Sequence, residues 1–201
     1  MKYYQELTIL PDPEISMYFI WRKLYTQLHI ALAELHNQHG IGTVGVSFPD
    51  YKYEEKDNKE FATLGNKLRI FATSKNDLQI LNIQKWLERL SDYIHIKSVQ
   101  EVPPKHGWLV ASRYRYKSLE NQAKQFAKHR GISLEESLQH CKQYKKAGRK
   151  GYPFINLKSL DNGQNFKLAI KQVEVESVGS GEFNTYGLNT NSQQATVPHW
   201  K

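Results

Sequence analysis

The sequence predicts an α+β protein, in which an N-terminal ferredoxin-like βαββαβ domain precedes a C-terminal, ferredoxin-like-related α+β domain that carries a basic helix. Three observations lead to this prediction. Segments with strand-like and helix-like periodicity alternate over residues 1–99. Residues 100–107 contain two prolines and a glycine, which is typical of a linker. All of the net charge of +8 lies beyond residue 100, because acids and bases balance before it. We therefore expect domains at residues 1–99 and 108–201.

The first domain has six predicted elements in the order strand, helix, strand, strand, helix, strand. The strands are residues 3–10, 42–48, 67–73 and 93–99, the helices are residues 14–36 and 76–90, and residues 51–65 form a loop. Pro11 and Pro13 end the first strand, and Ser74 suits the N-cap of the second helix. This order is that of the ferredoxin-like unit, in which two helices pack on one face of a sheet.

The first predicted helix carries its apolar residues on one stripe. These are Met17, Ile20, Trp21, Leu24, Leu28, Ala31 and Leu35. At about 100° per residue, His29 lies roughly 120° from the centre of that stripe. It shares its face with Tyr18, Arg22, Tyr25 and His36. Polar helix faces often carry solvated histidines, but imidazole is also the side chain best suited to moving a proton near neutral pH. His29 is therefore a candidate for either role.

The second domain begins with a strand and two helices and ends in a sheet. The strands are residues 108–116, 152–157, 165–175 and 182–188, the helices are residues 118–130 and 134–146, and residues 189–196 form a polar tail that we expect to be mobile. Ser118 and Gly131 bound the first of these helices. Ser133 and Glu136 form the capping-box signature of the second.

The basic charge is concentrated in residues 105–150, which hold twelve Lys or Arg against three acids. Clustered cations of this kind bind the phosphates of nucleic acids by releasing counterions. Arginine and tyrosine alternate at Arg113, Tyr114, Arg115 and Tyr116, which suits stacking on bases. A solvated helical face is the alternative interpretation. A DNA-binding regulator is disfavoured, because the sequence has no helix-turn-helix or zinc-finger pattern.

Composition argues against several other classes of protein. The only cysteine, Cys141, allows neither an internal disulfide nor a cysteine-rich zinc site, and it indicates a reducing, cytoplasmic location. No apolar run reaches the roughly 20 residues of a membrane span, and the first residues do not form a signal peptide. His36 and His39 lack a third metal ligand at helix spacing, and no phosphate-binding loop is present. We therefore expect no cofactor, no metal and no membrane partner.

A series of short motifs runs in order through both halves of the chain. They are Leu10-Pro11-Asp12-Pro13-Glu14, Lys23-Leu24 with Leu28-His29, Val44-Gly45-Val46-Ser47-Phe48-Pro49-Asp50, Leu68-Arg69-Ile70, Ser112-Arg113, Pro153-Phe154, Gly163-Gln164-Asn165-Phe166 and Tyr186-Gly187-Leu188. Together they resemble the CRISPR-associated repeat-processing (pre-crRNA) endoribonucleases of type I-F systems. The resemblance implies an enzyme that binds the hairpin of the repeat RNA and cuts it without metal at the 3′ base of the stem. The cut would proceed by 2′-hydroxyl attack and leave a 2′,3′-cyclic phosphate.

The resemblance also implies roles for individual residues and partners for the protein. His29, Ser159 and Tyr186 match the family's catalytic positions, with Tyr186 expected to orient the imidazole. The RNA-binding positions are Arg113, Arg115, Lys124, Gln125, Lys128, His129, Arg130 and Phe166, where Phe166 stacks on the end of the stem and residues 118–130 form the basic helix. We expect the protein to keep its processed crRNA within a type I-F surveillance complex and to be a monomer when free.

Other interpretations stay open beside these. On residue type alone, Ser159 would be a turn serine, and Tyr186 and Phe166 would be core aromatics. Alternatives to the serine are Ser112, Ser118 and Tyr152. A non-catalytic module that binds structured RNA is the alternative to the enzyme as a whole.

The chain departs from the family pattern at several points. The basic helix has lysines where relatives have arginines, and lysine lacks the planar fork for bidentate contacts. Arg115 stands where glutamine is expected, which shifts the preferred base edge from adenine towards guanine. Ser159 is followed by Leu160 and Asp161 where a second serine is expected, so that a carboxylate lies near the scissile phosphate. Residues 142–150 match no family contact.

Overall fold

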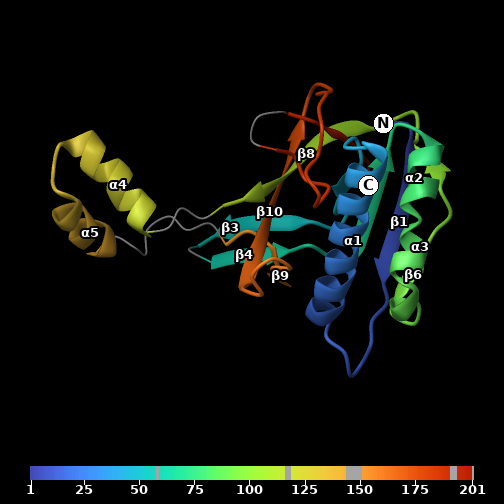
Figure 1. Ribbon diagram of the computed structural model, residues 1–201, viewed down its shortest axis with the longest axis horizontal. Coiled ribbons are helices and arrows are strands. Elements are labelled where there is room, and N and C mark those ends of the chain that lie inside the picture. The colour runs from blue at the N-terminus through green and yellow to red at the C-terminus, as the bar shows by residue number, and fades with distance from the viewer. Residues whose placement is uncertain (58, 116–118, 144–150, 191–193, 201) are drawn as a thin grey trace. The chain divides into compact units, whose positions relative to one another are not determined.

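The structure is a computed structural model that describes residues 1–57, 59–115, 119–143, 151–190 and 194–200 (Figure 1). It is mixed α+β with antiparallel sheets, which confirms the predicted class. The chain divides into two compact units, Met1–Arg113 with Tyr152–Lys201, and Tyr114–Gly151. These units differ from the predicted domains at residues 1–99 and 108–201, and that domain division stays a prediction. None of the described helices is long and apolar enough to cross a membrane.

The first sheet belongs to the larger unit. Its strands are β1 (Tyr3–Ile9), β2 (Gly45–Ser47), β5 (Lys67–Ala72), β6 (Ile94–Ile96) and β7 (Gln100–Glu101). The order is β2-β5-β1-β6, every pairing is antiparallel, and β7 pairs with the start of β1. The predicted linker at residues 100–107 therefore begins as a short strand of this sheet.

The helices of the larger unit are α1 (Met17–His39), α2 (Lys75–Leu81), α3 (Ile83–Trp86) and the 3-10 turn η1 (Glu88–Leu90). Helix α1 begins three residues later than predicted because Ser16 caps it, accepting a hydrogen bond from the Phe19 N–H at 3.4 Å. Ser74 caps α2 in a reciprocal capping box with Asp77, as predicted for the cap. The predicted helix over residues 76–90 is wrong as a single element, since Asn82 adopts φ 42° and ψ 54° and divides it.

The predicted loop at residues 51–65 is wrong, because it contains a hairpin of β3 (Lys52–Lys56) and β4 (Lys59–Thr63). Both strands are largely exposed and rich in charged residues, so they lack the apolar alternation from which a strand is predicted. Tyr53 stabilises the hairpin: its hydroxyl donates to Glu60 Oε1 at 2.9 Å, and its ring packs on Tyr152 with centroids 4.5 Å apart.

The second sheet contains β8 (Gly107–Tyr114), β9 (Phe154–Lys158), β10 (Asn165–Val175) and β11 (Val197–His199) in the order β11-β8-β10-β9. The predicted strand at residues 182–188 is wrong, because this segment is mostly a turn. The mobile tail predicted at residues 189–196 is also wrong for its described part, since Asn189, Ala195 and Thr196 are buried. Residues 191–193 of that tail lie outside the described residues.

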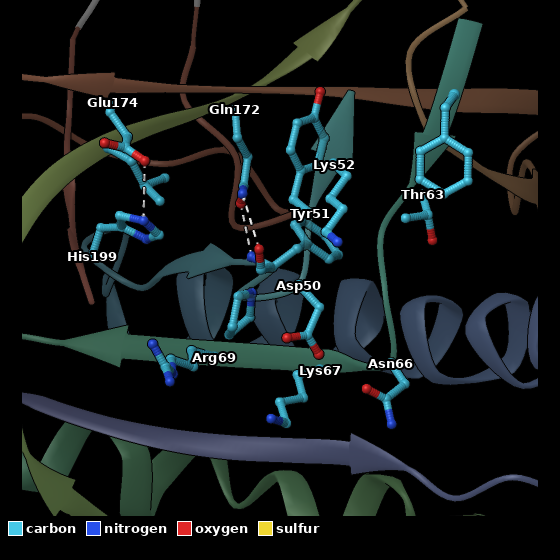
Figure 2. A pocket seen from close by; sticks show the side chains of 14 residues that line it. Asp50, Tyr51, Lys52, Thr63, Asn66, Lys67, Arg69, Gln172, Glu174 and His199 are labelled. Carbon is cyan, nitrogen blue, oxygen red and sulfur yellow. Dashed lines mark hydrogen bonds and ion pairs between the residues drawn. The ribbon is translucent and has the colours of Figure 1, made fainter. Parts of the chain in front are cut away.

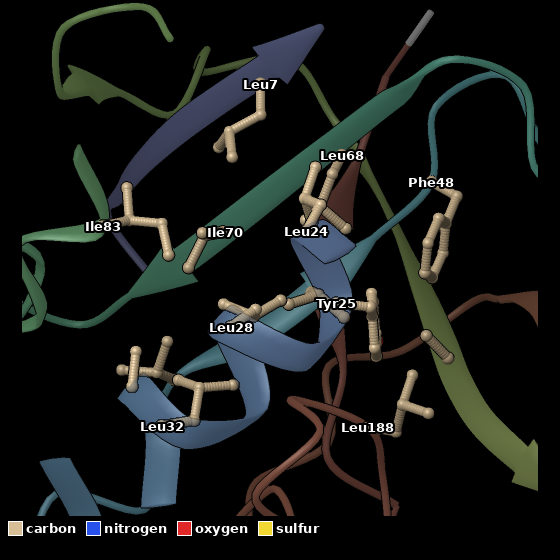
Figure 3. Close-up of a cluster of buried hydrophobic side chains, with 14 of the residues drawn as sticks. Leu7, Leu24, Tyr25, Leu28, Leu32, Phe48, Leu68, Ile70, Ile83 and Leu188 are labelled. Atoms are coloured by element: carbon tan, nitrogen blue, oxygen red, sulfur yellow. The ribbon is translucent and has the colours of Figure 1, made fainter. Parts of the chain in front are cut away.

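One hydrophobic core joins both sheets to α1 (Figure 3). Leu24 and Leu28 pack with Leu68 and Ile70 of the first sheet, and α1 also contacts β9 of the second. Each such side chain contributes about 1.5–3 kcal/mol by leaving water. Tyr25, which was predicted to share the polar face of His29, is fully buried in this core. Burial is possible because the Tyr25 hydroxyl donates a hydrogen bond to the Tyr186 carbonyl.

An ion cluster around the buried Glu6 and Arg69 links the two inner strands of the first sheet, β1 and β5. Glu6 of β1 is 5% exposed and accepts from Arg69 Nε at 2.8 Å and from Lys97 Nζ at 2.7 Å. Arg69 also donates to the Trp200 carbonyl at 2.8 Å and lies over the Trp200 ring. Burial acts to raise the pKa of Glu6, but the hydrogen bonds and charges of Lys97 and Arg69 outweigh it and lower the pKa.

The smaller unit is a pair of helices, α4 (Leu119–Arg130) and α5 (Leu134–Gln143). Gly131 ends α4 at φ 67°, and Ser133 and Glu136 form the predicted capping box of α5. The Ser137 hydroxyl donates to the Ala123 carbonyl at 2.7 Å, and Phe126 stacks on His140. The predicted cap Ser118 and the basic residues within 144–150 lie outside the described residues.

Candidate active site

His29 lies on α1, one turn after the buried Tyr25, and is itself half-buried. Its Nδ1 is 2.9 Å from the backbone carbonyl oxygen of Thr185. A carbonyl can only accept a hydrogen bond, so Nδ1 is the nitrogen that carries the proton. In the neutral ring this leaves Nε2 with a free lone pair, which is the state that a general base requires.

Tyr186 covers one face of the imidazole. The two rings are almost parallel, at 6°, with centroids 4.0 Å apart. Partial burial raises the pKa of the Tyr186 phenol; the Arg113 guanidinium opposes this effect and the Asp161 carboxylate adds to it. Arg113 and Asp161 therefore both lie within electrostatic reach of the stacked pair. The expectation that Tyr186 orients the imidazole stays a prediction, and the stacked geometry is compatible with it.

The loop that carries Thr185 and Tyr186 is held by hydrogen bonds from three directions. Asn184 Oδ1 accepts from the N–H groups of Tyr186 at 2.8 Å and Leu188 at 3.3 Å. The Tyr25 hydroxyl donates to the Tyr186 carbonyl at 2.9 Å. The Val46 N–H donates to the Gly187 carbonyl at 2.9 Å, which joins the loop to β2. Sequence reasoning gave Tyr25 and Asn184 no function, although an asparagine three residues before a glycine is a turn signal.

Ser159 lies in the turn between β9 and β10. Its N–H donates to the Gln164 carbonyl at 2.8 Å, and its hydroxyl accepts from the Asn162 N–H at 3.5 Å, the limit of a hydrogen bond. The turn-serine interpretation thus describes its local structure. Among the described residues no hydrogen bond joins Ser159 to His29, and the carboxylate of Asp161, in the same turn, adds to the raised pKa of Tyr186. Of the alternatives, Ser112 lies on β8 and Tyr152 is buried against Tyr53.

Arg113 and Phe166 form a second contact of this region. The guanidinium lies over the phenyl ring at 5.2 Å from its centroid, in the geometry of a cation–π interaction. Phe166 is half-buried and lies opposite Leu157 of β9. It packs partly against the hydrophobic core and is partly accessible to solvent. The larger unit thus brings together His29, Tyr186, Arg113 and Phe166 of the predicted site.

The other predicted RNA-binding residues belong to the smaller unit. Arg115 is exposed, and so are all five on α4, namely Lys124, Gln125, Lys128, His129 and Arg130. Lys124 pairs with Glu120 one turn before it at 3.1 Å, and Arg130 lies over Phe126. Ala123 packs on α5 from the face of α4 that is opposite Lys124, Gln125, Lys128 and His129, while Arg130 lies on the same side as Ala123. Helix α4 therefore presents a basic surface within its unit.

A cavity of about 840 Å³ lies beside the β3–β4 hairpin (Figure 2). The Gln172 side chain bonds both the N–H and the carbonyl of Phe48 there, and His199 pairs with Glu174 at 3.3 Å. Its charges are mixed, and none of the predicted site residues lines it. The described His, Cys, Asp and Glu residues also form no group of three that could hold a metal ion.

Comparison with known proteins gives consistent matches over almost the whole chain. A family model described as CRISPR-associated protein (Cas_Csy4) matches residues 4–200. A protein of Escherichia coli (strain UTI89 / UPEC), described as CRISPR-associated endonuclease Cas6/Csy4, is 33% identical over 199 residues, which is 98% of this chain and 99% of that protein. A protein of Pseudomonas aeruginosa (strain UCBPP-PA14) with the same description is 30% identical over 191 residues, covering 94% and 96%. A solved structure described as an RAMP protein binding different RNA substrates aligns over 98% of this chain and 99% of its own, at 11% identity and a TM-score of 0.36.

Proposed function

The chain belongs to the CRISPR-associated Csy4 family, and we propose that it is an endoribonuclease that processes CRISPR repeat RNA. It binds the hairpin of the repeat, cuts at the 3′ base of the stem without a metal ion, and stays bound to the mature crRNA. The observation that carries this proposal is the contact between His29 Nδ1 and the Thr185 carbonyl. That contact leaves Nε2 of the neutral ring ready to accept a proton.

The reaction follows from this arrangement. Nε2 of His29 takes the proton of the 2′-hydroxyl, and the 2′-oxygen attacks the adjacent phosphorus in line with the leaving 5′-oxygen. The P–O5′ bond breaks, the 5′-oxygen takes up a proton, and the products are a 2′,3′-cyclic phosphate and a 5′-hydroxyl. Proton transfer by a placed base contributes about 10²- to 10⁴-fold to such a rate. Ser159 holds the attacking oxygen through its hydroxyl, which has only a marginal bond within its own turn.

The remaining residues place the RNA. Arg113, beside the stacked pair, contacts the RNA next to the cut, and the exposed part of Phe166 stacks on the end of the stem. Base–aromatic stacking contributes about 1–3 kcal/mol per base. Lys124, Lys128 and Arg130 hold the stem by its phosphates, with Gln125 and His129 beside them, and Arg115 reads a base. The exposure of these α4 side chains supports this role.

The setting of the enzyme is also part of the proposal. The strand order β2-β5-β1-β6, with α1 and α2 packed together beside the sheet, supports a ferredoxin-like unit at residues 1–99. Membership of the family supports action in the cytoplasm as a monomer that joins other subunits of a type I-F surveillance complex once it holds its crRNA.

The test is cleavage of the cognate repeat hairpin in EDTA. We expect cutting at the 3′ base of the stem, a 2′,3′-cyclic phosphate on the upstream product, and no cutting of a hairpin with a single 2′-deoxy substitution at that site. Binding without cleavage would instead support the non-catalytic RNA-binding module. Cleavage of the 2′-deoxy hairpin would contradict the proposed mechanism, because the attacking oxygen is then absent.

A further inference from the structure

We propose that Asn184 is a positioning residue for the reaction, since it holds the Thr185 carbonyl against His29 and thereby selects the imidazole tautomer that can act as a base. Tyr25 supports the same loop from α1. The inference rests on the proposed function, because it concerns how His29 is prepared to take a proton. Neither residue is assigned a contact with the RNA.

Asn184 closes the turn that contains Thr185. Its side-chain oxygen accepts from Tyr186 and Leu188, its own N–H donates to the Leu188 carbonyl at 2.9 Å, and its carbonyl accepts from the Gly187 N–H at 2.8 Å. Two of these four bonds end on one oxygen atom of one side chain. Such an Asx turn imposes a local backbone conformation that the flanking residues do not impose by themselves.

Packing alone does not fix this segment. Asn184 and Thr185 are half-buried, and both line a cavity of about 230 Å³ together with Phe183, Gly42 and His36. Without the Asn184 side chain, the N–H groups of Tyr186 and Leu188 lose their acceptor and the loop can move into that space. The Thr185 carbonyl oxygen lies 2.9 Å from His29 Nδ1. If it moved about 1 Å further away, the two atoms would be too far apart for a hydrogen bond.

The consequence for His29 is chemical. With Thr185 as acceptor the neutral ring is protonated at Nδ1 and basic at Nε2. When that acceptor is lost, the tautomer protonated at Nε2 becomes populated. Its lone pair is on Nδ1, so Nε2 can no longer take the proton of the 2′-hydroxyl. Activity then falls with the fraction of enzyme in the competent tautomer, whereas binding of the hairpin does not depend on it.

Tyr25 fixes the loop to the helix that carries the histidine. Its ring is fully buried and lies 6.0 Å from the Phe48 ring, and its hydroxyl donates to the Tyr186 carbonyl at 2.9 Å. Burial raises the pKa of Tyr25, so the hydroxyl remains a donor. Because Tyr25 and His29 are one helical turn apart, α1 holds the imidazole and also the loop that orients it.

The experiment combines nitrogen NMR of the histidines with single-turnover cleavage. The ¹⁵N shifts of His29, recorded in the free protein with the ring neutral, report which ring nitrogen is protonated. We expect the Nδ1–H tautomer in the wild type, a mixture in Asn184→Ala, and recovery in Asn184→Ser, whose hydroxyl can accept the same bond. Asn184→Ala should lower kcat about 10-fold and change the Kd for the hairpin less than about 2-fold.

Asp12→Ala is the matched control. Asp12 Oδ1 accepts from the N–H groups of Glu14 at 2.9 Å and Ile15 at 2.7 Å, so this variant also loses two Asx-turn bonds, but ahead of α1. It should lose stability without changing the tautomer of His29. Should Asn184→Ala fail to fold, Tyr25→Phe replaces it, because it removes the bond from α1 to the same loop and should shift the tautomer in the same direction.

The outcomes separate the inference from the function on which it rests. An Asn184→Ala protein that keeps the Nδ1–H tautomer overturns the inference, whether its kcat is unchanged or falls together with its affinity. A wild-type protein that has this tautomer, loses it in Asn184→Ala and yet never cuts the hairpin overturns the proposed function and leaves the positioning role in place.

Discussion

The site around His29 and the pair of helices α4 and α5 are held together in different ways. His29 bonds a carbonyl 156 positions later in the chain, and Tyr25 bonds one 161 positions later. In the helical pair, Ser137 bonds a carbonyl 14 positions away and Ser133 bonds Glu136 three positions away. Within the described part of that unit, only Ala123 and Ser137 are buried.

The difference matches what each region has to do under the proposed function. Proton transfer requires fixed distances, and a rigid core with long-range bonds provides them. Phosphate binding requires positive charge on an accessible surface, and it tolerates a unit with a small core because the interaction is not directional. Changes in the first region should therefore affect kcat or folding, and changes in the second should affect affinity.

The largest effect is expected from His29→Ala. Removing the base should lower kcat by about 10²- to 10⁴-fold, while the Kd for the hairpin changes by less than about 2-fold. Single-turnover cleavage and filter binding measure the two quantities separately. His39→Ala, an exposed histidine at the end of the same helix, is the control and should cut at the wild-type rate. Wild-type cleavage by His29→Ala would remove the catalytic assignment.

The next largest effect is a loss of stability on replacing a glycine, and it should differ between two glycines that have almost the same φ. Gly187 has φ 69° and Gly131 has φ 67°, but a Cβ on Gly187 would lie 2.6 Å from Val46 Cγ1 whereas one on Gly131 meets nothing within 4 Å. Gly187→Ala should therefore lower the free energy of unfolding by about 2–3 kcal/mol, and Gly131→Ala by about 1 kcal/mol. Urea unfolding measures both. Equal losses of unfolding free energy in the two variants would mean that the loop around Gly187 shifts to relieve the contact with Val46.

Removing charge from the helical pair should act on affinity alone. The double variant Lys124→Ala and Lys128→Ala should bind the hairpin about 10-fold more weakly, and the slope of log K against log salt should fall by about 0.7–0.9 for each lost phosphate contact. The kcat at saturation should stay unchanged. Lys75→Ala with Lys85→Ala removes two exposed lysines from α2 and α3 and is the matched control. An unchanged slope would show that α4 does not touch phosphates.

The smallest effect is a pH dependence of stability. The pKa of Glu6 is lowered in the folded state, so its carboxylate stabilises the fold above the unfolded pKa of about 4.3, and this contribution is lost as the pH falls through the folded value. The difference in unfolding free energy between wild type and Glu6→Gln should therefore shrink on acidification. Glu136→Gln in the exposed capping box of α5 should show a weaker dependence. Parallel curves for wild type and Glu6→Gln would contradict this assignment.

Local sequence signals predicted the elements that local contacts form. The caps at Ser74 and Ser133 and the glycine end of α4 follow from hydrogen bonds within a few residues, and β10 was predicted with its observed bounds. Strand β11 was missed because its partner, Leu109 opposite Val197, is distant in the chain and leaves no local pattern. The charged hairpin β3–β4 was missed because its strands bury little apolar surface.

The candidate site was predictable where motifs mark it. Family motifs pointed to His29, Tyr186, Arg113 and Phe166, and the structure brings these four into one region. Tyr25 and Asn184 escaped notice because they act on backbone groups, which no motif records. Residues 182–188 were predicted as a strand, and the positive φ of Gly187 together with the bonds to Asn184 shows the turn.

The distance in sequence between His29 and Thr185 has a consequence for how the enzyme is made. A ribosome must add more than 150 residues after the histidine before its carbonyl partner exists. Helix α1 can form early, since its contacts within the helix are local, but the tautomer of His29 stays unselected until the last strands have folded back onto α1. Under the proposed function, nascent chains therefore carry His29 in an unselected tautomer, and it becomes competent as a base only once the Thr185 loop has folded onto α1.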